Sequence, residues 1–386
     1  VVVVDGFTVI VTKSTVPVGT ADEIVDQLKN TAASGVDVVW NPEFLREGFA
    51  VQDTLKPDRL VVGLASERAE QVMRSVYAPL IADGVPFLVT DFPTAELVKV
   101  AANSFLATKI SFINAMAEVC EAAGADVTML ATAMGYDPRI GNRFLSAGLG
   151  FGGGCLPKDI RAFMARAGEL GAEEALTFLR EVDQINLRRR EHTVDLARKT
   201  LGGDLRGKVV TVLGATFKPD SDDVRDSPAL DVAVAIYNAG AHVRVHDPKG
   251  LPNAERVYPH MDYRSDLDDA ATGSDLLILG TEWREYRDLD PASLIDKVRN
   301  AVIIDGRNVL DPHLWRSAGW TYRALGRPTA RVRRRSPAPE KRRRSPSRQS
   351  EMTRPRPPTE SKPRIPSTIS PILEETQRTK TKKKKF

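Results

Sequence analysis

Thr94–Ala123 reads TAELVKVAANSFLATKISFINAMAEVCEAA. A helix drawn through this stretch has apolar residues on nearly every face, and such a helix is normally buried on all sides, between domains or between subunits. On both sides of it, the sequence alternates apolar runs with helical patterns. We therefore expect a long central helix that joins two α/β lobes.

Before this helix, the sequence predicts a first lobe, residues 1–92. The strands are expected at Thr8–Val11, Val36–Trp40, Leu60–Gly63 and Pro86–Thr90, and the helices at Pro17–Ala33 and Ser66–Tyr77. Strands that alternate with helices predict a largely parallel, doubly wound sheet.

After the helix, further helical patterns precede a second α/β unit. The helices are expected around Val127–Met134, Ile160–Leu170 and Ala172–Leu201, and the strands at Lys208–Leu213, His242–His246, Leu276–Gly280 and Val302–Ile304. The predicted fold class is α/β, with two doubly wound, Rossmann-like lobes joined by the long central helix. We assign residues 93–204 to a central helical domain and residues 205–326 to the second lobe.

The last stretch, residues 327–386, differs in composition from the rest. It contains 20 Lys and Arg against 5 Asp and Glu, a net charge of +15, and 10 of the 25 prolines. The whole chain carries +4, so the preceding residues carry −11. A segment this basic and this poor in apolar residues cannot bury a core, and we expect a disordered, solvated tail. Its basic clusters leave open a non-specific, salt-sensitive contact with nucleic acid; they are Arg331–Arg335, Lys341–Arg344 and Lys382–Lys385.

Composition also bears on where the chain works. No apolar run approaches the roughly 20 residues that cross a bilayer, so no membrane segment is expected. Two cysteines in 386 residues cannot build a disulfide framework, which indicates a reducing compartment and a cytoplasmic location. No metal site is expected.

The sharpest motif is Gly148–Asp159, GLGFGGGCLPKD. Glycines at this density let a backbone approach a ligand closely and supply amide donors for a phosphate or an oxyanion. A helix expected to begin near Pro157 points its positive end at Cys155, and Lys158 is adjacent; both features favour a reactive thiolate. A flexible turn with an incidental cysteine is the alternative. Cys120, by contrast, lies in mid-helix among apolar residues and is assigned to the core.

Two other segments place polar residues four positions apart. Asn41–Gly48 reads NPEFLREG, with an Asn cap, a Pro at the first helical position and a final Gly. One helical turn would put Glu43 and Glu47 on one face, either as a general base with a hydroxyl-binding partner or merely as acids that stabilise a helix N-terminus. Lys99 and Asn103 repeat the spacing in the apolar helix, where a cation and an amide donor suit a developing oxyanion.

A nucleotide-binding crossover is suggested by Gly214 after one expected strand and Asp247 at the end of the next. One glycine in place of three makes the signal weak. No expected strand is followed by Gly-x-Gly-x-x-Gly, because the glycines before Cys155 follow helical sequence.

In their order along the chain, these motifs resemble the UDP-glucose 6-dehydrogenase family, within the wider UDP-glucose/GDP-mannose dehydrogenases. The resemblance runs from about Thr8 to Leu325, through Lys13–Thr20, Asn41–Gly48, Pro57–Arg59, Lys99 with Asn103, Arg139–Gly141, the Cys155 loop, Phe217–Lys218 and Asp305–Asn308. The family oxidises the C6 alcohol of the sugar twice with NAD. The resemblance therefore implies NAD as cofactor, UDP-glucose as substrate, UDP-glucuronate as product, and a homodimer formed through the 94–123 helix.

The family's site residues carry over by motif. The catalytic positions are Cys155, Glu43, Lys99, Asn103, Asp159 and Thr15. The substrate positions are Glu43, Phe44, Leu45, Arg46, Glu47, Lys99, Asn103, Arg139, Ser146, Phe151, Gly152, Phe217, Lys218 and Arg307, and the cofactor positions are Thr15, Glu47, Cys155, Lys158 and Arg225. The resemblance implies that Cys155 forms a hemithioacetal and then a thioester, and that Glu43 assists its hydrolysis.

The chain departs from the family at both ends. Members begin with a strand and a Gly-x-Gly-x-x-Gly turn that holds the NAD pyrophosphate; that segment is missing here, so we expect a truncated first lobe and a chain that is inactive alone. The basic tail is also foreign to the family pattern. Two alternatives stay open: a dehydrogenase of GDP-mannose or a UDP-N-acetylhexosamine, and a non-catalytic fragment that binds a nucleotide sugar.

Overall fold

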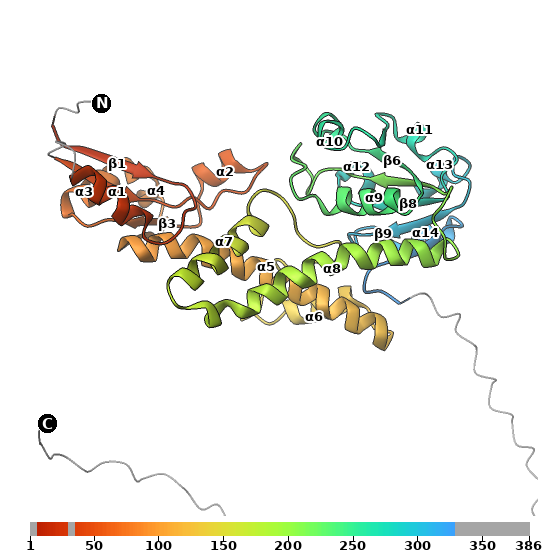
Figure 1. Cartoon of the computed structure of the whole chain (residues 1–386), viewed down its shortest axis with the longest axis horizontal. Helices are drawn as coiled ribbons and strands as arrows, with labels where there is room; N and C mark the ends of the chain where they lie inside the picture. Colours follow the sequence, from red (N-terminus) through yellow and green to blue (C-terminus); the bar gives the residue numbers. More distant parts are fainter. Residues whose placement is uncertain (1–5, 30–34, 329–386) are drawn as a thin grey trace, which may run out of the picture. The chain divides into compact units, whose positions relative to one another are not determined.

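The computed structural model describes residues 6–29 and 35–328. Within them, two α/β lobes flank a group of helices built around α5 (Phe92–Ala123), as Figure 1 shows. The expected α/β class with Rossmann-like lobes and a long central helix is confirmed. The disorder expected of residues 327–386 concerns residues outside the described part, except at its start, where the prediction is wrong for Arg327 because its guanidinium pairs with Asp126 at 3.2 Å. Among the helices that the structure describes, none combines the length and the apolar character needed to cross a membrane.

The first lobe is built on a four-stranded sheet in the order β1-β2-β3-β4. Its elements are β1 (Thr8–Thr12), α1 (Thr20–Lys29), β2 (Val36–Trp40), α2 (Ala50–Leu55), β3 (Leu60–Gly63), α3 (Glu67–Val76), α4 (Ala78–Ala82) and β4 (Phe87–Thr90). The outer pairs are parallel, but β2 and β3 meet antiparallel, at Trp40 and Gly63. The expected parallel order is wrong there, because α2 has only 6 residues and is no crossover helix.

Helices cover both faces of this sheet, because successive side chains of a strand point to opposite faces. Val38 and Val61 pack on one face against Ala95 of α5. Val39 packs on the other face against Met73 of α3. The sheet therefore positions the start of α5, and with it the polar residues of that helix.

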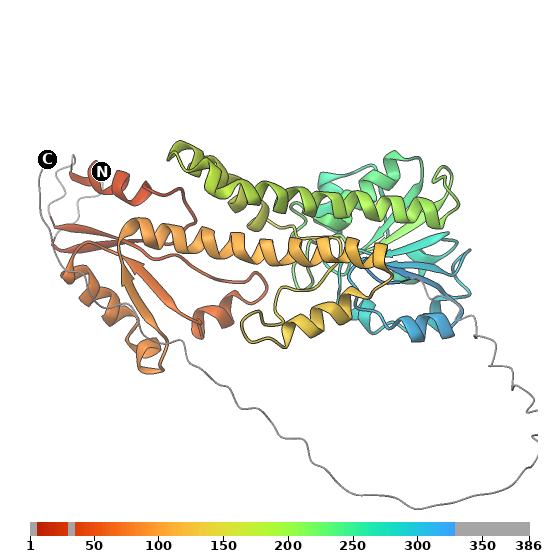
Figure 2. The same cartoon turned by 90° about the horizontal axis from the view of Figure 1, so that it is seen from below.

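The central helix α5 begins and ends close to the expected residues. Asp91 caps it, since its carboxylate accepts the amide hydrogen of Thr94 at 2.7 Å. Gly124 ends it with a left-handed φ of 73°. α8 (Thr177–Thr200) runs alongside α5 (Figure 2). The other elements of this part are α6 (Val127–Gly135), α7 (Leu156–Glu169) and the 3-10 helix η1 (Glu173–Leu176).

α5 is not buried on all sides by a single copy of the chain. A stripe of large apolar side chains is exposed, with Leu97 at 37%, Phe105 at 66%, Phe112 at 45% and Val119 at 57%. Their spacing of seven or eight residues keeps them on one face of the helix. The remaining faces pack against the first sheet and against α6, α7 and α8.

The second lobe contains a six-stranded sheet in the order β10-β9-β8-β5-β6-β7, in which all neighbours are parallel. Its strands are β5 (Val209–Leu213), β6 (His242–His246), β7 (Asp262–Tyr263), β8 (Leu276–Leu279), β9 (Val302–Asp305) and β10 (Thr321–Ala324). Its helices are α9 (Pro228–Asn238), α10 (Leu251–Val257), α11 (Leu267–Ala271), α12 (Arg284–Arg287), α13 (Pro291–Leu294) and α14 (Pro312–Ser317). The two edge strands, β7 and β10, were not expected, because both are short and neither is a continuous apolar run.

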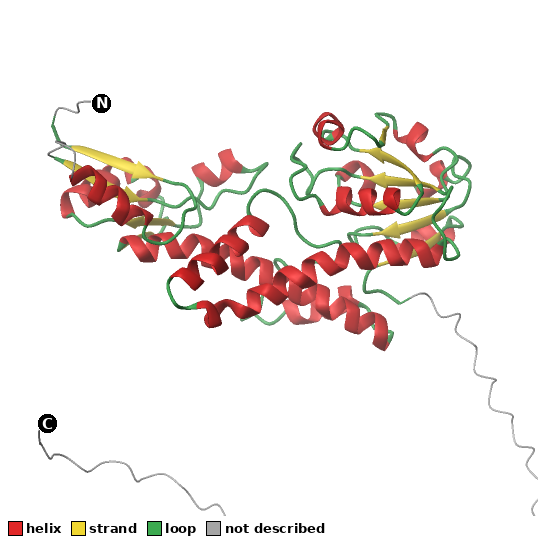
Figure 3. Ribbon diagram, viewed as in Figure 1, coloured by secondary structure: helices red, strands yellow, loops and turns green. Residues whose placement is uncertain are grey.

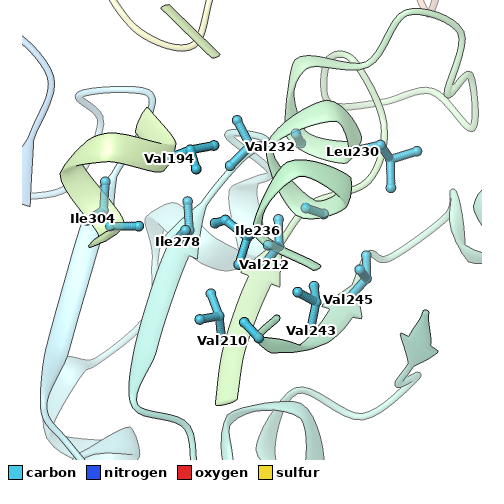
Figure 4. Packing of buried hydrophobic residues seen from close by; sticks show 14 of the residues in the cluster. Val194, Val210, Val212, Leu230, Val232, Ile236, Val243, Val245, Ile278 and Ile304 are labelled. Atoms are coloured by element: carbon cyan, nitrogen blue, oxygen red, sulfur yellow. The ribbon is translucent and has the colours of Figure 1, made fainter. Parts of the chain in front are cut away.

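Helices lie on both sides of this sheet (Figure 3). Ile278 packs on one face with Val194 of α8 and Ile236 of α9, as Figure 4 shows. Its neighbour Leu277 packs on the other face with Trp315 of α14. Fully burying such a side chain contributes roughly 1.5–3 kcal/mol. Two covered faces explain why the central strands are continuous apolar runs in the sequence.

Gly326 joins the second lobe to the central helices, and its replacement is predicted to destabilise the protein. Its N–H donates to Glu121 at 2.6 Å, and it has a φ of 74°. A Cβ there would lie 2.6 Å from Ala117 Cβ and 2.7 Å from Val127 Cγ1. Overpacking and left-handed strain together should lower the free energy of unfolding by about 2–4 kcal/mol in Gly326→Ala.

The matched control is Gly273→Ala, which has a similar φ of 71° but nothing within 4 Å of the added Cβ. Its free energy of unfolding should fall less, because only the left-handed backbone strain applies there. Thermal melts that fall equally for the two variants would contradict the tight packing at Gly326.

Candidate active site

Cys155 is exposed and occupies the N-cap position of α7. Pro157 suits the first turn of this helix, because it needs no amide donor there. The amide of Asp159 donates to the Cys155 carbonyl at 2.9 Å and closes the turn. The thiol therefore lies at the positive end of α7, as expected. Cys120 is buried in α5, and burial raises the pKa of its thiol.

The glycine loop, residues 148–154, packs tightly against the rest of the protein. A Cβ at Gly150 would lie 2.2 Å from Asn186 Oδ1. A Cβ at Gly152 would lie 2.1 Å from the carbonyl oxygen of Asp226. Side chains at these positions have no space, so the glycines serve contact within the protein.

The amide groups of this loop are also engaged. Those of Gly148 and Phe151 donate to asparagine side chains at 2.8 Å and 2.7 Å. That of Gly153 donates to the carbonyl of Arg225 at 2.9 Å. The expectation that the loop amides face a phosphate or an oxyanion is wrong for these three, because protein acceptors already hold them.

The loop after β5 covers the residues just before the thiol. A Cβ at Gly153 would lie 2.7 Å from the ring of Phe217. A Cβ at Gly154 would lie 2.6 Å from the guanidinium carbon of Arg225. The pKa of Arg225 is raised, first by its hydrogen bond to Asp223. The structure thus brings two of the expected ligand-binding residues beside the cysteine.

Lys218 and Glu47 belong to the same cluster. The Lys218 ammonium donates to the Glu47 carbonyl at 2.5 Å, and the Ser221 hydroxyl donates to the Glu47 carboxylate. Burial lowers the pKa of Lys218, and the charges of Glu47 and Cys155 oppose that shift. The same two groups act on Arg225. Lys218, Arg225 and Glu47 therefore form one charged cluster, and the charge of Cys155 acts on both of its cations.

A second cluster lies at the first turn of α7. Asp159 is 2% exposed and accepts a hydrogen bond from Asn103 Nδ2 at 2.6 Å. Lys158 Nζ lies 3.3 Å from its other oxygen. These partners offset the cost of burying the carboxylate. Thr15, Lys158 and Asp159 also line one pocket of about 70 Å³, together with apolar side chains such as Phe163.

Lys99 is buried, and its counter-ion is Glu43, with 3.3 Å between Nζ and Oε1. The ring of Phe44 lies near two cations. Its centroid is 5.6 Å from Lys99 Nζ and 3.8 Å from the guanidinium carbon of Arg59. Because Lys99 and Asn103 are one turn apart on α5, the Glu43 and Asp159 carboxylates lie along the same side of this helix. Glu43 is therefore the counter-ion that a buried lysine such as Lys99 requires.

The helical turn expected at Asn41–Gly48 is wrong. Residues 41–46 have no helix, and α2 begins only at Ala50. The Glu43 carboxylate accepts the amide hydrogen of Leu45 at 2.5 Å, and the amide of Arg46 donates to Asp53 at 2.8 Å. Side chains that bind local amides compete with helix formation. Glu43 and Glu47 therefore point to different partners.

Several expected ligand-binding side chains have other surroundings. Arg139 is 88% exposed at its side chain and pairs with Asp137. Arg46 holds Asp53 through two guanidinium nitrogens, at 2.6 Å and 3.0 Å. Ser146 and Leu45 are exposed, and Phe151 is buried. None of these five has a side-chain contact with the cysteine among the hydrogen bonds and ion pairs of the described residues.

Arg307 lies behind the glycine loop. Its guanidinium donates to the carbonyls of Gly150 at 3.0 Å and Gly280 at 2.7 Å, and it lies 3.2 Å from the Glu282 carboxylate. It therefore connects the loop to the carboxyl end of β8.

One residue that organises the site was missed from the sequence. Glu96 is 2% exposed and accepts the amide hydrogens of Gly19 at 2.7 Å and Ala21 at 2.8 Å. It holds the loop that contains Thr15 at the start of α1. A lone carboxylate in the apolar stretch, three residues before Lys99, was the available signal.

Asp247, the acid of the weak crossover signal, has protein partners at both carboxylate oxygens. It is 3% exposed, and its oxygens accept hydrogen bonds from the Ala215 and Gly250 amides at 2.7 Å and 2.6 Å and from Trp283 Nε1 at 3.0 Å. Gly214 is required because a Cβ there would lie 2.4 Å from Thr281. This part of the weak crossover signal reflects a structural turn.

The chain matches three domain models of one family. Residues 2–81 match the NAD binding domain of the UDP-glucose/GDP-mannose dehydrogenase family, residues 93–188 match its central domain, and residues 211–312 match its UDP binding domain. The matched family uses NAD as cofactor.

Curated and solved proteins of this kind are similar over most of the chain. The UDP-glucose 6-dehydrogenase of Rickettsia typhi is 43% identical over 319 residues, which cover 82% of this chain and 73% of that protein. The one of Rhizobium meliloti is 43% identical over 326 residues, covering 84% and 74%. The structure of a UDP-glucose dehydrogenase from Pyrobaculum islandicum has a TM-score of 0.75 and 38% identity, covering 83% and 72%.

The NAD-binding domain requires a correction. The sequence predicted a chain that lacks the cofactor-binding segment, with a truncated first lobe. That prediction is not borne out, because residues 2–81 match the NAD binding domain. The Gly-x-Gly-x-x-Gly turn is a single motif, whereas the match extends from β1 through α3.

Proposed function

Since the chain belongs to the UDP-glucose/GDP-mannose dehydrogenase family of NAD-dependent oxidoreductases, we propose that it oxidises UDP-glucose to UDP-glucuronate in two steps. The observation that carries the proposal is the exposed Cys155 thiol at the start of α7, next to the buried Asn103–Asp159 pair. The similarity to UDP-glucose 6-dehydrogenases supports UDP-glucose as the sugar. Domains at 1–92, 93–204 and 205–326 and a reducing, cytoplasmic compartment belong to the same proposal.

The first oxidation converts the C6 alcohol into an aldehyde. NAD, when bound, accepts a hydride from C6 in each oxidation. The hydroxyl proton passes to a water held by Thr15 and Asp159, which line one pocket. Lys99 and Asn103 present an ammonium and an amide from one side of α5, so they stabilise the charge that develops on the oxygen.

The second oxidation proceeds on the cysteine. The Cys155 thiolate attacks the aldehyde carbon, a C–S bond forms, and the oxygen takes up a proton to give a hemithioacetal. Loss of the proton and the hydride leaves a thioester. A water then adds to the thioester carbon, the C–S bond breaks, and the thiolate leaves with the uronate released. Glu43 takes the proton of that water, and its ion pair with Lys99 holds the carboxylate in place.

The residues at the carboxyl end of β1 fit the reacting end of NAD. In parallel α/β sheets, ligands bind where strands end and helices begin. Thr15 follows β1 there, and the pocket offers a hydroxyl, the Lys158 ammonium and the apolar side chains of Val16 and Phe163. That combination suits a polar amide and ribose on a flat ring. Glu47 and Arg225 are also assigned to the cofactor. The charge of Glu47 contributes to the raised pKa of Arg225.

The sugar nucleotide is assigned to the space beside the glycine loop. Phe217 and Lys218 come from the second lobe, whose residues match the UDP binding domain. Arg307 holds the loop from behind through the Gly150 carbonyl, and Phe151 and Gly152 belong to the loop itself, so these three residues contribute through the backbone. The substrate positions Glu43, Phe44, Leu45, Arg46, Glu47, Lys99, Asn103, Arg139 and Ser146 complete the proposed set.

The activity is predicted to depend on Cys155 and to yield two NADH per UDP-glucose. Cys155→Ser should lower turnover by about three orders of magnitude or more, because an alcohol is a poor nucleophile and a poor leaving group here. Cys120→Ala is the matched control and should retain turnover, since that thiol is buried in the core. Absorbance at the NADH band and chromatography of the product measure both steps.

The same assay tests the alternatives. Faster oxidation of GDP-mannose or a UDP-N-acetylhexosamine would contradict the choice of sugar. UDP-glucose binding by calorimetry without any NADH would contradict the catalytic proposal and favour a non-catalytic nucleotide-sugar binder, the outcome expected of an inactive chain.

The exposed stripe on α5 is proposed to pair with a second copy of the chain. Its heptad-like spacing presents a continuous apolar face, and a face of this kind is self-complementary in a twofold dimer. Arg139, exposed in the turn that follows α6, would then be available to the neighbouring site.

Charged residues in this stripe are predicted to abolish the dimer. The double variant Phe105→Asp, Phe112→Asp should sediment as a monomer, because burying two carboxylates opposite their copies is costly. Leu314→Asp changes an apolar side chain of similar exposure, 50%, in the second lobe and should leave the dimer intact. A wild-type monomer, or a dimer in all three proteins, would contradict this interface.

A further inference from the structure

The peptide groups of the glycine loop are held by side chains of the two long central helices. Asn114 on α5 accepts the amide hydrogen of Gly148 at 2.8 Å. Arg189 on α8 donates to the carbonyl of the same residue at 3.4 Å. Both side chains are fully buried. Gly148 is therefore held at its donor and at its acceptor from inside the helical domain.

Phe151, three residues after Gly148, is held in the same way and with shorter hydrogen bonds; we call the pairing of Asn186 with Phe151 the clamp. Asn186 on α8 accepts the amide hydrogen of Phe151 at 2.7 Å through Oδ1 and donates to the carbonyl of Phe151 at 2.9 Å through Nδ2. A side-chain amide that pairs with the N–H and the C=O of one residue fixes the two peptide groups on either side of its Cα atom. Asn186 is 1% exposed, so water does not compete for either bond.

Arg190, the fourth residue on from Asn186, connects this clamp to the second lobe. Its guanidinium donates to the Phe151 carbonyl at 3.0 Å and to the Asp226 carboxylate at 2.9 Å, and it also pairs with Asp231. The Asp226 carbonyl in turn contacts Gly152. The loop thus has helix α8 on one side and the second lobe on the other.

We infer that Asn186 is a positioning residue for Cys155, acting through the glycine loop. Its Oδ1 occupies the space that a Cβ at Gly150 would need, so loop and side chain are matched in shape as well as in hydrogen bonds. The loop runs directly into the N-cap of α7. A tilt of the Phe151 peptide would therefore be transmitted to the thiol. This role in turnover rests on the function proposed above.

The experiment compares Asn186→Ala with Thr193→Val. Thr193 is a matched control: it is fully buried on the same helix, and its hydroxyl donates to the Arg189 carbonyl within that helix. Hydrogen exchange is measured on the peptide that spans residues 148–154, in the absence of substrate, and kcat and KM are measured with UDP-glucose. Asn186→Asp, which keeps the acceptor for the Phe151 amide but loses the donor, is the second variant should Asn186→Ala fail to fold.

Exchange of the Phe151 amide should be about ten-fold faster in Asn186→Ala than in wild type and Thr193→Val, since its partner is lost. kcat should fall on the order of 100-fold with KM nearly unchanged, because a thiol displaced by about 1 Å still permits binding. Asn186→Asp should give an exchange rate and a kcat between those of Asn186→Ala and wild type. Unchanged exchange at Phe151, or an unchanged kcat despite faster exchange, would overturn the assignment. A wild type without turnover would contradict the function proposed above, while faster exchange in the variant would still support the clamp.

Discussion

There is no room for a Cβ atom along most of the segment that leads to Cys155, and the rest of the site follows from that constraint. Side chains at Gly150, Gly152 and Gly153 would lie 2.1–2.7 Å from protein atoms. The loop is consequently sandwiched between α8 and the second lobe. Such a fit fixes the backbone, and the fixed backbone places the thiol at the N-terminus of α7. The cysteine owes its position to packing that involves two separate parts of the fold.

The polar groups of the site are supported from the opposite direction, by α5. Lys99 and Asn103 are largely buried on this helix, and each meets a carboxylate, Glu43 or Asp159. A buried ion pair is weak evidence for stability, since desolvation offsets much of the attraction. The Asn103–Asp159 pair lies at the first turn of the helix that Cys155 caps, and this position fits a role in chemistry. The cluster of Lys218, Arg225 and Glu47 is more exposed, and Arg225 lies against Gly154, which directly precedes the cysteine.

Much of the fold could be predicted from the sequence, because its strongest signals are periodic. The 94–123 stretch lies wholly within α5, and the mainly apolar runs of β5 and β8 are strands covered on both faces. The short β7, half-buried at a sheet edge, lacks such a pattern and was missed. The antiparallel contact between Trp40 and Gly63 depends on the path of the connecting chain, which periodicity does not encode.

The site was also predicted only in part, because local sequence patterns reveal some of its residues but not contacts between distant segments. Motif spacing found Cys155, Lys99 and Asn103, but local propensity favoured a helix around Glu43 that side-chain bonds to the backbone prevent. The contribution of Asn186 depends on a contact across 35 positions of sequence, which no local pattern reveals.

The most direct test of the account is mass spectrometry of acid-quenched Glu43→Gln protein after incubation with UDP-glucose and NAD. We predict a UDP-glucuronyl thioester on the peptide that contains Cys155, whereas product formation without any adduct there, or an adduct on Cys120, would contradict it.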